Sequence, residues 1–188
     1  MALIQDIKTG SLIKQIYLKL ISDNERITWK TLRFGNDARP KTQFTVWLHM
    51  HGRLMTVDRL SSWGINVDPI CNLCNSHNET RNHVFMECPF SNKVWEGVLK
   101  WMQVPLFRTS QWELMEKWII KTSKGKSQRA QIFKIAYTEW VHTMWIERNQ
   151  RIFEKITKSH SQLMREIAYV CNIRASTRIK KLVQQLNI

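Results

Sequence analysis

Residues 71–88 of this chain read CNLCNSHNETRNHVFMEC, and this stretch decides how the rest of the sequence is interpreted. It contains the spacing C-x2-C-x8-H-x4-C, formed by Cys71, Cys74, His83 and Cys88. Thiolate and imidazole groups at such spacings are typical ligands of tetrahedral zinc. Because the protein would supply all four ligands, the site would be closed to substrate. We therefore predict one structural Zn2+ ion and no catalytic one.

Two other residues near this pattern have alternative interpretations. His77 lies between the two ligand pairs and could replace His83 as the fourth ligand. The remaining cysteine, Cys171, lies in an apolar stretch and is interpreted as a small core residue. The N-terminal residues carry charges through any apolar segment, so no secretory signal is expected. We therefore place the chain in a reducing compartment, nuclear or cytoplasmic and not secreted.

The composition predicts a mainly helical protein. The chain has 188 residues, of which 43% are apolar, enough to bury a core in one domain or in one domain with an appendage. Only six glycines and four prolines interrupt it, and no segment alternates convincingly between apolar and polar residues as a strand would. No apolar run approaches the ~20 residues that a bilayer span needs, so no membrane partner is expected.

Apolar spacing predicts the positions of the helices. In the second of them, Phe44, Trp47, Leu48 and His51 follow the i, i+3, i+4, i+7 pattern of a buried face. The expected helices cover residues 12–21, 44–51, 56–65, 91–102, 112–120, 128–156 and about 161–186.

Signals at the helix ends support several of these assignments. Ser11 could cap the first helix, and Thr56 could cap the third. Asp58 would sit favourably at the positive end of the third helix, while Gly64 could take the left-handed conformation that ends it. Ser159 or Ser161 would cap the last helix.

The net charge of +14 is concentrated in the last third of the chain. Residues 1–120 carry 15 basic and 11 acidic side chains, whereas residues 121–188 carry 14 basic and four acidic ones. The change coincides with a polar, cationic stretch at 121–127 that is typical of a linker. We therefore expect an N-terminal helical segment (1–39), a zinc-binding domain (40–120), the linker (121–127) and a basic helical hairpin (128–188).

Such a basic hairpin favours a polyanionic partner. Its cations could neutralise phosphates of RNA or DNA without reading the base sequence. The candidate nucleic-acid-binding residues are Lys121, Lys124, Lys126, Arg129, Arg148, Arg151, Arg174, Arg178, Lys180 and Lys181. The alternative is a solvated cationic face with no partner. The nine tryptophans could stack on bases, although their helical spacing favours core packing.

A longer pattern runs through and beyond the metal ligands. The pattern begins before the first cysteine pair, Cys71-x-Leu-Cys74, with Phe44-x-x-Trp47-Leu48, Gly52-Arg-Leu54-x-Thr56-x-Asp58-x-Leu60 and Gly64-Ile65. The pattern continues with Glu79-Thr80-x-x-His83-x-Phe85-x-x-Cys88-Pro-Phe90 and Val94-Trp95. Over residues 40–102 this closely resembles the zinc-binding region downstream of the polymerase in plant non-LTR (LINE-type) retrotransposon reverse transcriptases. Trp145-x-x-Arg148-Asn149-x-x-x-Phe153 resembles the segment that follows it, before an RNase H domain.

The resemblance implies His83, not His77, as the fourth zinc ligand. It also implies association with RNA or DNA, and with the polymerase or RNase H domains of the same polyprotein as further partners. No aromatic-x-Asp-Asp polymerase motif is present, and the acidic residues are too dispersed for two-metal RNase H chemistry. His49, His51 and Cys171 have no context that indicates a nucleophile and its base, so we predict no enzymatic activity.

Two functions are therefore expected as alternatives. The first is a zinc-stabilised nucleic-acid-binding module that contacts phosphates through the basic hairpin. The second is a protein-interaction or spacer module between polymerase and RNase H domains, without nucleic-acid contact. A contiguous apolar patch on the hairpin would favour the protein partner, and an unbroken cationic surface would favour nucleic acid.

Overall fold

The computed structural model describes residues 28–33 and 35–186. The helix expected at 12–21, with its proposed Ser11 cap, and most of the expected N-terminal segment 1–39 lie outside these residues. The first described element is a short 3-10 helix, η1 (Thr28–Leu32).

The prediction of a mainly helical protein is confirmed as far as the structure describes the chain, and the cysteines and histidine of the predicted zinc site lie together. No strand occurs in the described residues, where a single antiparallel bridge joins Ile70 and Asn78. The helices after η1 are α2 (Pro40–Met50), α3 (Val57–Ser62), η2 (His83–Glu87), α4 (Pro89–Trp101), α5 (Trp112–Ser123), α6 (Gln128–Phe153), α7 (His160–Arg174) and α8 (Thr177–Gln185).

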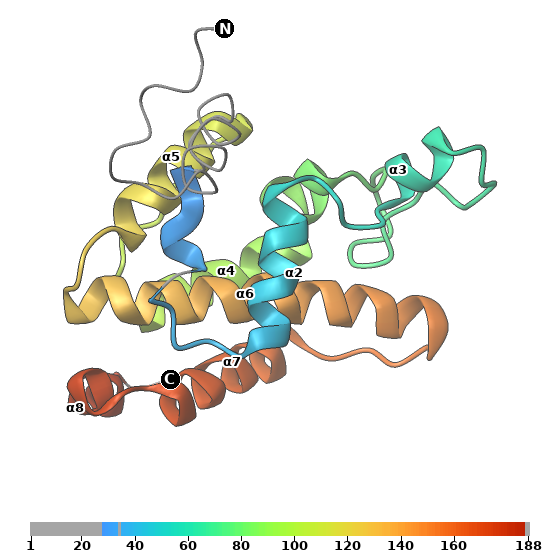
Figure 1. Cartoon of the computed structure of the whole chain (residues 1–188). Coiled ribbons are helices and arrows are strands. Elements are labelled where there is room, and N and C mark those ends of the chain that lie inside the picture. The colour runs from blue at the N-terminus through green and yellow to red at the C-terminus, as the bar shows by residue number, and fades with distance from the viewer. Residues whose placement is uncertain (1–27, 34, 187–188) are drawn as a thin grey trace, which may run out of the picture.

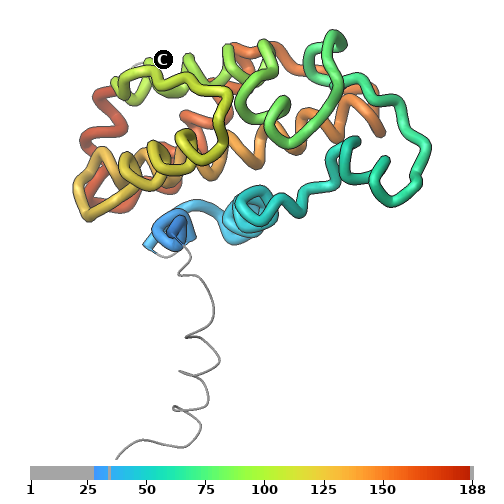
Figure 2. The backbone as a smooth tube through the Cα atoms, turned by 90° about the horizontal axis from the view of Figure 1, so that it is seen from above, coloured from blue at the N-terminus to red at the C-terminus, as the bar shows by residue number. Residues whose placement is uncertain are grey.

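The long helix α6 is the centre of the fold, and the other helices surround it (Figure 1). Seen from above, η1 and α2 lie on one side of α6 and α4 lies on the opposite side (Figure 2). Helices α5, α7 and α8 also contact α6, and α7 packs against α4. The segment with α3 and the metal ligands lies toward the C-terminal half of α6.

Helix α6 is buried almost all round in its first half, from Ile132 to His142. Trp140 packs against Trp95 of α4 at 4.6 Å between ring centroids, with Phe85 and Tyr137 beside it. Because this part of α6 is buried on every side, including the polar side formed by Glu139 and His142, it is a core helix and not one arm of a separate hairpin. Buried residues on both sides of the expected linker belong to one hydrophobic cluster, from Trp29 to Val183.

The predicted helix at 44–51 exists within α2, but its predicted buried face is wrong. Phe44 is 59% exposed and His51 is also exposed, while Trp47 and Leu48 are half-buried. A polar face packs on α6 instead: Thr42 donates to Glu139 Oε1 at 3.1 Å, and Thr45 lies 2.8 Å from Nδ1 of His142. Since Glu139 also pairs with Arg39, hydrogen bonding decides which side of α2 faces the core.

Helix α3 ends as predicted and begins differently. Gly64 has φ +78°, the Gly64 N–H donates to Ser61 O, and the Ile65 N–H donates to Leu60 O, which together form a Schellman motif. The side chain of Thr56 makes no capping hydrogen bond. Glu79 takes that role, because its carboxylate accepts the Val57 N–H at 3.0 Å.

Two boundaries in the second half also differ from prediction. Helix α4 begins at Pro89, two residues before the expected start at Ser91. The single last helix is two helices, because the chain turns at residues 175–176 between α7 and α8. Ser159, one of the two predicted caps, forms a capping box with Gln162 at the start of α7. The expected two-helix hairpin is therefore a three-helix segment whose first helix is the core of the fold.

Candidate metal centre

Cys71, Cys74, His83 and Cys88 converge as the spacing predicts. Their ligand atoms, three Sγ and one imidazole nitrogen, all lie within 4.8 Å of one another, and Cys74 Sγ lies 3.3 Å from His83 Nε2. Four such atoms in a compact group can hold one zinc ion in tetrahedral geometry. His77 is exposed and does not belong to this group, although its ring stacks on that of His83 at 5.4 Å.

The first ligand pair lies on a tight backbone loop. The N–H of Cys71 donates to His77 O at 2.8 Å, and that of Glu79 donates to Pro69 O at 2.8 Å, so the loop returns on itself. The Asn75 N–H donates to Cys71 O while Asn75 adopts a left-handed φ of +53°. This turn places both sulfurs on the same side of the loop, which a C-x2-C spacing requires in a zinc knuckle.

The second ligand pair depends on a π turn. Arg81 and Asn82 begin a helix whose next residues, His83–Glu87, have π geometry, and the Cys88 N–H donates to His83 O at 2.7 Å. An i→i+5 turn brings residues five apart toward one side, whereas an ordinary α turn would separate them. The H-x4-C spacing therefore matches this rare geometry, which is frequent at functional sites.

The environment of Cys71 and Cys88 favours one thiolate that shares a proton with the other sulfur. The hydrogen bond between the two buried side chains lowers the pKa of Cys88 to about 5 and raises the pKa of Cys71. Backbone amides of Ser91 and Phe90, in the first turn of α4, also lower the pKa of Cys88. Those of Cys74 and Leu73 act in the same direction on Cys71, but the hydrogen bond to Cys88 and burial outweigh them. A divalent cation would replace the shared proton and stabilise both thiolates.

A buried ion pair anchors the loop that carries Cys71 and Cys74, which we call the metal loop, to α6. Arg148 donates through Nη2 to Glu79 Oε1 at 2.6 Å and through Nε to Glu79 Oε2 at 3.0 Å, and both side chains are at most 5% exposed. Glu79 follows the first ligand pair by five residues and also caps α3 through Val57. The carboxylate thus joins α3, the metal loop and the C-terminal half of α6.

Arg151 makes a second connection one turn farther along α6. Its Nη1 donates to Leu73 O at 2.9 Å, inside the C-x2-C loop, and its Nε donates to Glu147 Oε1 at 2.7 Å. The guanidinium also lies 4.1 Å from the ring centroid of Phe90, beside Cys88. Sequence reasoning missed both connections, since nothing in the spacing of these charges indicates that they meet.

These contacts correct two of the predicted nucleic-acid-binding residues. Arg148 is 4% exposed and the side chain of Arg151 is 12% exposed, and both are engaged inside the protein. Their cations are therefore not available to phosphates, and the prediction is wrong for them. The other candidates lie at the surface or partly so: Lys121, Lys124, Lys126, Arg129, Arg174, Arg178, Lys180 and Lys181.

Some of these surface cations also make contacts within the protein. Arg174 donates to Asp37 O at 2.8 Å, Lys180 donates to Asn172 O at 2.9 Å, and Arg129 donates to Met102 O at 3.4 Å. These acceptors are neutral carbonyl groups, so they leave the positive charges uncompensated. No ion pair found among the described residues involves any of the eight cations.

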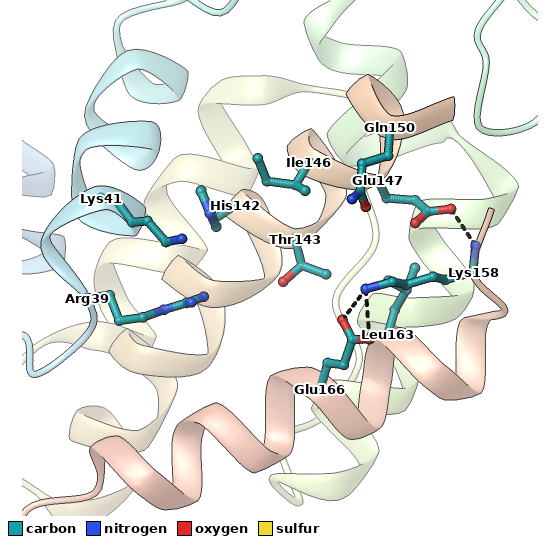
Figure 3. Close-up of a pocket in the computed structure, with 10 residues that line it drawn as sticks. All are labelled: Arg39, Lys41, His142, Thr143, Ile146, Glu147, Gln150, Lys158, Leu163 and Glu166. Atoms are coloured by element: carbon teal, nitrogen blue, oxygen red, sulfur yellow. Dashed lines mark hydrogen bonds and ion pairs between the residues drawn. The ribbon is translucent and has the colours of Figure 1, made fainter. Parts of the chain in front are cut away.

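A hollow of about 330 Å³ lies between the start of α2, the second half of α6 and the start of α7 (Figure 3). Lys158 extends across it to both oxygens of Glu166, and its backbone N–H donates to Glu147 at 2.9 Å. Burial lowers the pKa of His142, which lines it, to about 4, and its Nδ1 is engaged with Thr45. Arg39, Lys158, Glu147 and Glu166 in the lining all belong to ion pairs, and no nucleophile in this hollow lies beside a free base.

The other residues considered for chemistry are core residues. Burial lowers the pKa of His49 to about 3 and raises the pKa of Cys171 beyond its usual range. The sequence favoured core packing for the tryptophans; in the structure Trp29, Trp95, Trp101 and Trp140 are buried, and Trp63 is 53% exposed. No helix among residues 28–33 and 35–186 has the length and apolar character needed to cross a membrane.

Comparison with known proteins agrees with this centre. Residues 12–95 match the family model described as zinc-binding in reverse transcriptase, which confirms the family resemblance over that part of the chain. The matched region is a zinc-binding part of such proteins and not their catalytic part. The plant non-LTR origin stays a prediction. No curated protein and no solved structure matches the chain.

Proposed function

We propose that this chain, whose residues 12–95 match the zinc-binding region of reverse transcriptases, is a non-catalytic nucleic-acid-binding module stabilised by one zinc ion. The observation that carries the proposal is a surface of uncompensated positive charge at one end of the molecule. We call this surface the basic end and define it by Lys121, Lys124, Lys126, Arg129, Arg178 and Lys181.

The fold gathers the basic end from two distant parts of the sequence. The side chain of Gln128 donates to Arg178 O at 2.8 Å, so the start of α8 lies against the start of α6 (Figure 1). Neither residues 117–138 nor residues 167–188 contain an Asp or Glu. Such a surface attracts phosphates and releases their counterions without contacting base edges, so RNA and DNA would bind with little dependence on sequence.

Fluorescence anisotropy with labelled DNA and RNA tests the proposal. We expect affinity to fall steeply with salt, as counterion release requires. The variant Lys124→Ala/Lys126→Ala/Arg178→Ala should weaken binding and reduce the magnitude of the salt slope by up to about 3, one for each phosphate that is no longer neutralised.

A matched control removes the same charge elsewhere. Lys93, Lys155 and Arg165 are exposed and lie outside the basic end, so replacing all three by Ala should change binding far less. An affinity that is independent of salt, or equal losses in the two triple variants, would contradict the proposal.

The second candidate function, a protein-interaction or spacer module, has one observation in its favour. Tyr169 and Ile173 are spaced i, i+4 on α7 and are 66% and 57% exposed, which forms an apolar patch on that helix. We propose the polymerase or RNase H domain of the same polyprotein as the partner of this patch. Co-purification with those domains that is lost in Tyr169→Ser/Ile173→Ser, without loss of nucleic-acid binding, would support it.

The proposed setting follows from the family match and the cysteines. We propose a reducing compartment, either nuclear or cytoplasmic, because thiols stay reduced there and remain free to bind zinc. Imaging of a tagged chain tests this part, and recovery of the protein from the secretory pathway would contradict it.

A further inference from the structure

The outward face of α2 carries a row of aromatic rings that the core covers only in part. Phe44, Trp47 and His51 follow one another along it, with the Phe44 and Trp47 rings stacked at 5.8 Å and 13°, and Trp47 and His51 at 4.8 Å. Trp29 of η1 supports the far end, its ring centroid 5.1 Å from that of His51. We call Phe44, Trp47 and His51 the aromatic row.

Several of these rings are accessible. Phe44 is 59% exposed and His51 is exposed, whereas Trp47 is half-buried and packs its inner side on the core. In Figure 2, α2 lies at one edge of the molecule, and α6 runs along its inner side. The opposite side of α2 is fixed by the hydrogen bonds of Thr42 and Thr45 and by the buried ring of His49. Rotating the helix to bury the row would break those two hydrogen bonds and expose His49.

The charge around the row favours an anionic partner. The Arg53 guanidinium lies 5.6 Å from the ring centroid of Trp47, and Arg53 is exposed. Between Asp37 and Asp58 the sequence has no acidic residue. Arg39 pairs with Glu139, while Lys41 and Arg53 are exposed and have no ion pair among the described residues. Flat rings beside cations are the elements with which proteins bind single strands, because bases stack on the rings and phosphates meet the charges.

We infer that the aromatic row is a stacking platform for the unpaired bases of single-stranded RNA or DNA. The inference rests on the proposed function and adds to it both a location and a preference for single strands. The exposed ring of Phe44 would take a base, Arg53 would meet the adjoining phosphate, and the basic end would contact phosphates farther along. Stacking tolerates every base, so the preference is for strandedness and not for sequence.

The test compares a fluorescein-labelled oligothymidylate with a duplex of equal length, at one salt concentration, by anisotropy. The variant is Phe44→Ala, and the matched control is Phe153→Ala, which removes a ring that is 77% exposed at the end of α6. We expect Phe44→Ala to weaken binding of the single strand about fivefold or more, since stacking contributes ~1–3 kcal/mol per base. Duplex affinity should stay within about twofold, Phe44→Trp should retain single-strand affinity, and Phe153→Ala should change neither.

Thermal melting of both variants verifies that they remain folded. The inference is overturned if Phe44→Ala binds the single strand as the parent protein does, or if it loses duplex affinity to the same extent. In either case binding by the basic end would still stand. If the parent protein binds neither form, the proposed function fails as well, so the two failures can be told apart.

Discussion

Replacing Arg148 by Met should destabilise the protein severely, because it leaves a carboxylate buried without its cation. Glu79 has a fully buried side chain, and Arg148 supplies three of its hydrogen bonds, at 2.6, 3.0 and 3.2 Å. The Val57 N–H donates a further hydrogen bond to the same carboxylate. Removing one member of a buried ion pair costs about 3–5 kcal/mol, against a total stability of ~5–15 kcal/mol for a typical domain.

Urea unfolding of the zinc-loaded protein, followed by far-UV circular dichroism, measures this cost. Arg178→Met is the matched control, because Arg178 is exposed on α8 and should change the free energy of unfolding by less than ~0.5 kcal/mol. The double variant Glu79→Gln/Arg148→Met removes both charges and keeps an oxygen for the Val57 N–H. It should recover much of the loss, because replacing a whole buried pair is often close to neutral.

The result that refutes the reasoning is an Arg148→Met variant within ~0.5 kcal/mol of the parent protein. Such a value is typical of an exposed pair and would mean that the pair does not anchor the metal loop. A double variant as unstable as the sum of its two single variants would also contradict the account, since contacting partners must show coupling.

Three further predictions concern the metal ligands, Arg178 and His49. Cys74→Ser or His83→Ala should lower the melting temperature and abolish its sensitivity to a chelator. The loss of folding free energy should not exceed the ~10–16 kcal/mol that zinc binding contributes in small zinc modules. A parent protein whose melting temperature does not change with a chelator would disprove this prediction. Arg178→Ala should leave the melting temperature unchanged and weaken nucleic-acid binding, which melting and anisotropy can separate. Burial lowers the pKa of His49 to about 3, so below pH ~6.5 the unfolded chain takes up a proton that the folded chain does not. The free energy of unfolding should therefore decrease as the pH is lowered, by up to ~1.4 kcal/mol per pH unit. His49→Phe should lose this part of the pH dependence, and equal slopes for the variant and the parent protein between pH ~6.5 and ~5 would refute the assignment.

The metal centre could be predicted from the sequence because its ligands have a spacing that chemistry restricts. Two cysteines three residues apart must lie on one turn, and a His–Cys pair downstream completes the tetrahedron. The π turn that brings His83 and Cys88 together could not be predicted, because its stability comes from the surrounding contacts and not from residue preference.

The helix positions were also predictable, while the orientation of α2 was not. Apolar periodicity located α4 and α5 closely: α4 begins two residues before the predicted start, and α5 continues three residues beyond the predicted end. In α2 Phe44 and His51 lie on the outer side, while Val46 and Met50 are buried on the inner side. The inner side also carries Thr42 and Thr45, which are hydrogen-bonded to Glu139 and His142 of α6. The free-energy cost of leaving a buried polar group without a hydrogen-bond partner exceeds the gain from burying a few rings. Apolar periodicity contains no information about this cost.

The internal contacts of Arg148 and Arg151 could likewise not be predicted from the sequence. Arg148 is 69 residues from Glu79 in the sequence and Arg151 is 78 residues from Leu73, and a net charge cannot show which cations are paired internally. The family resemblance included both Glu79 and Arg148, and the structure supplies the reason: the two side chains pair directly. The surface available to nucleic acid is therefore smaller and more localised than composition suggests.

The central claim is that Cys71, Cys74, His83 and Cys88 together hold one zinc ion. Elemental analysis of the protein purified without added metal or chelator tests it most directly. The account predicts close to one zinc ion per chain in the parent protein and a large loss in Cys74→Ser, with Cys171→Ser unchanged as the matched control. A folded parent protein that contains no bound metal, or that retains its zinc in Cys74→Ser, would contradict it.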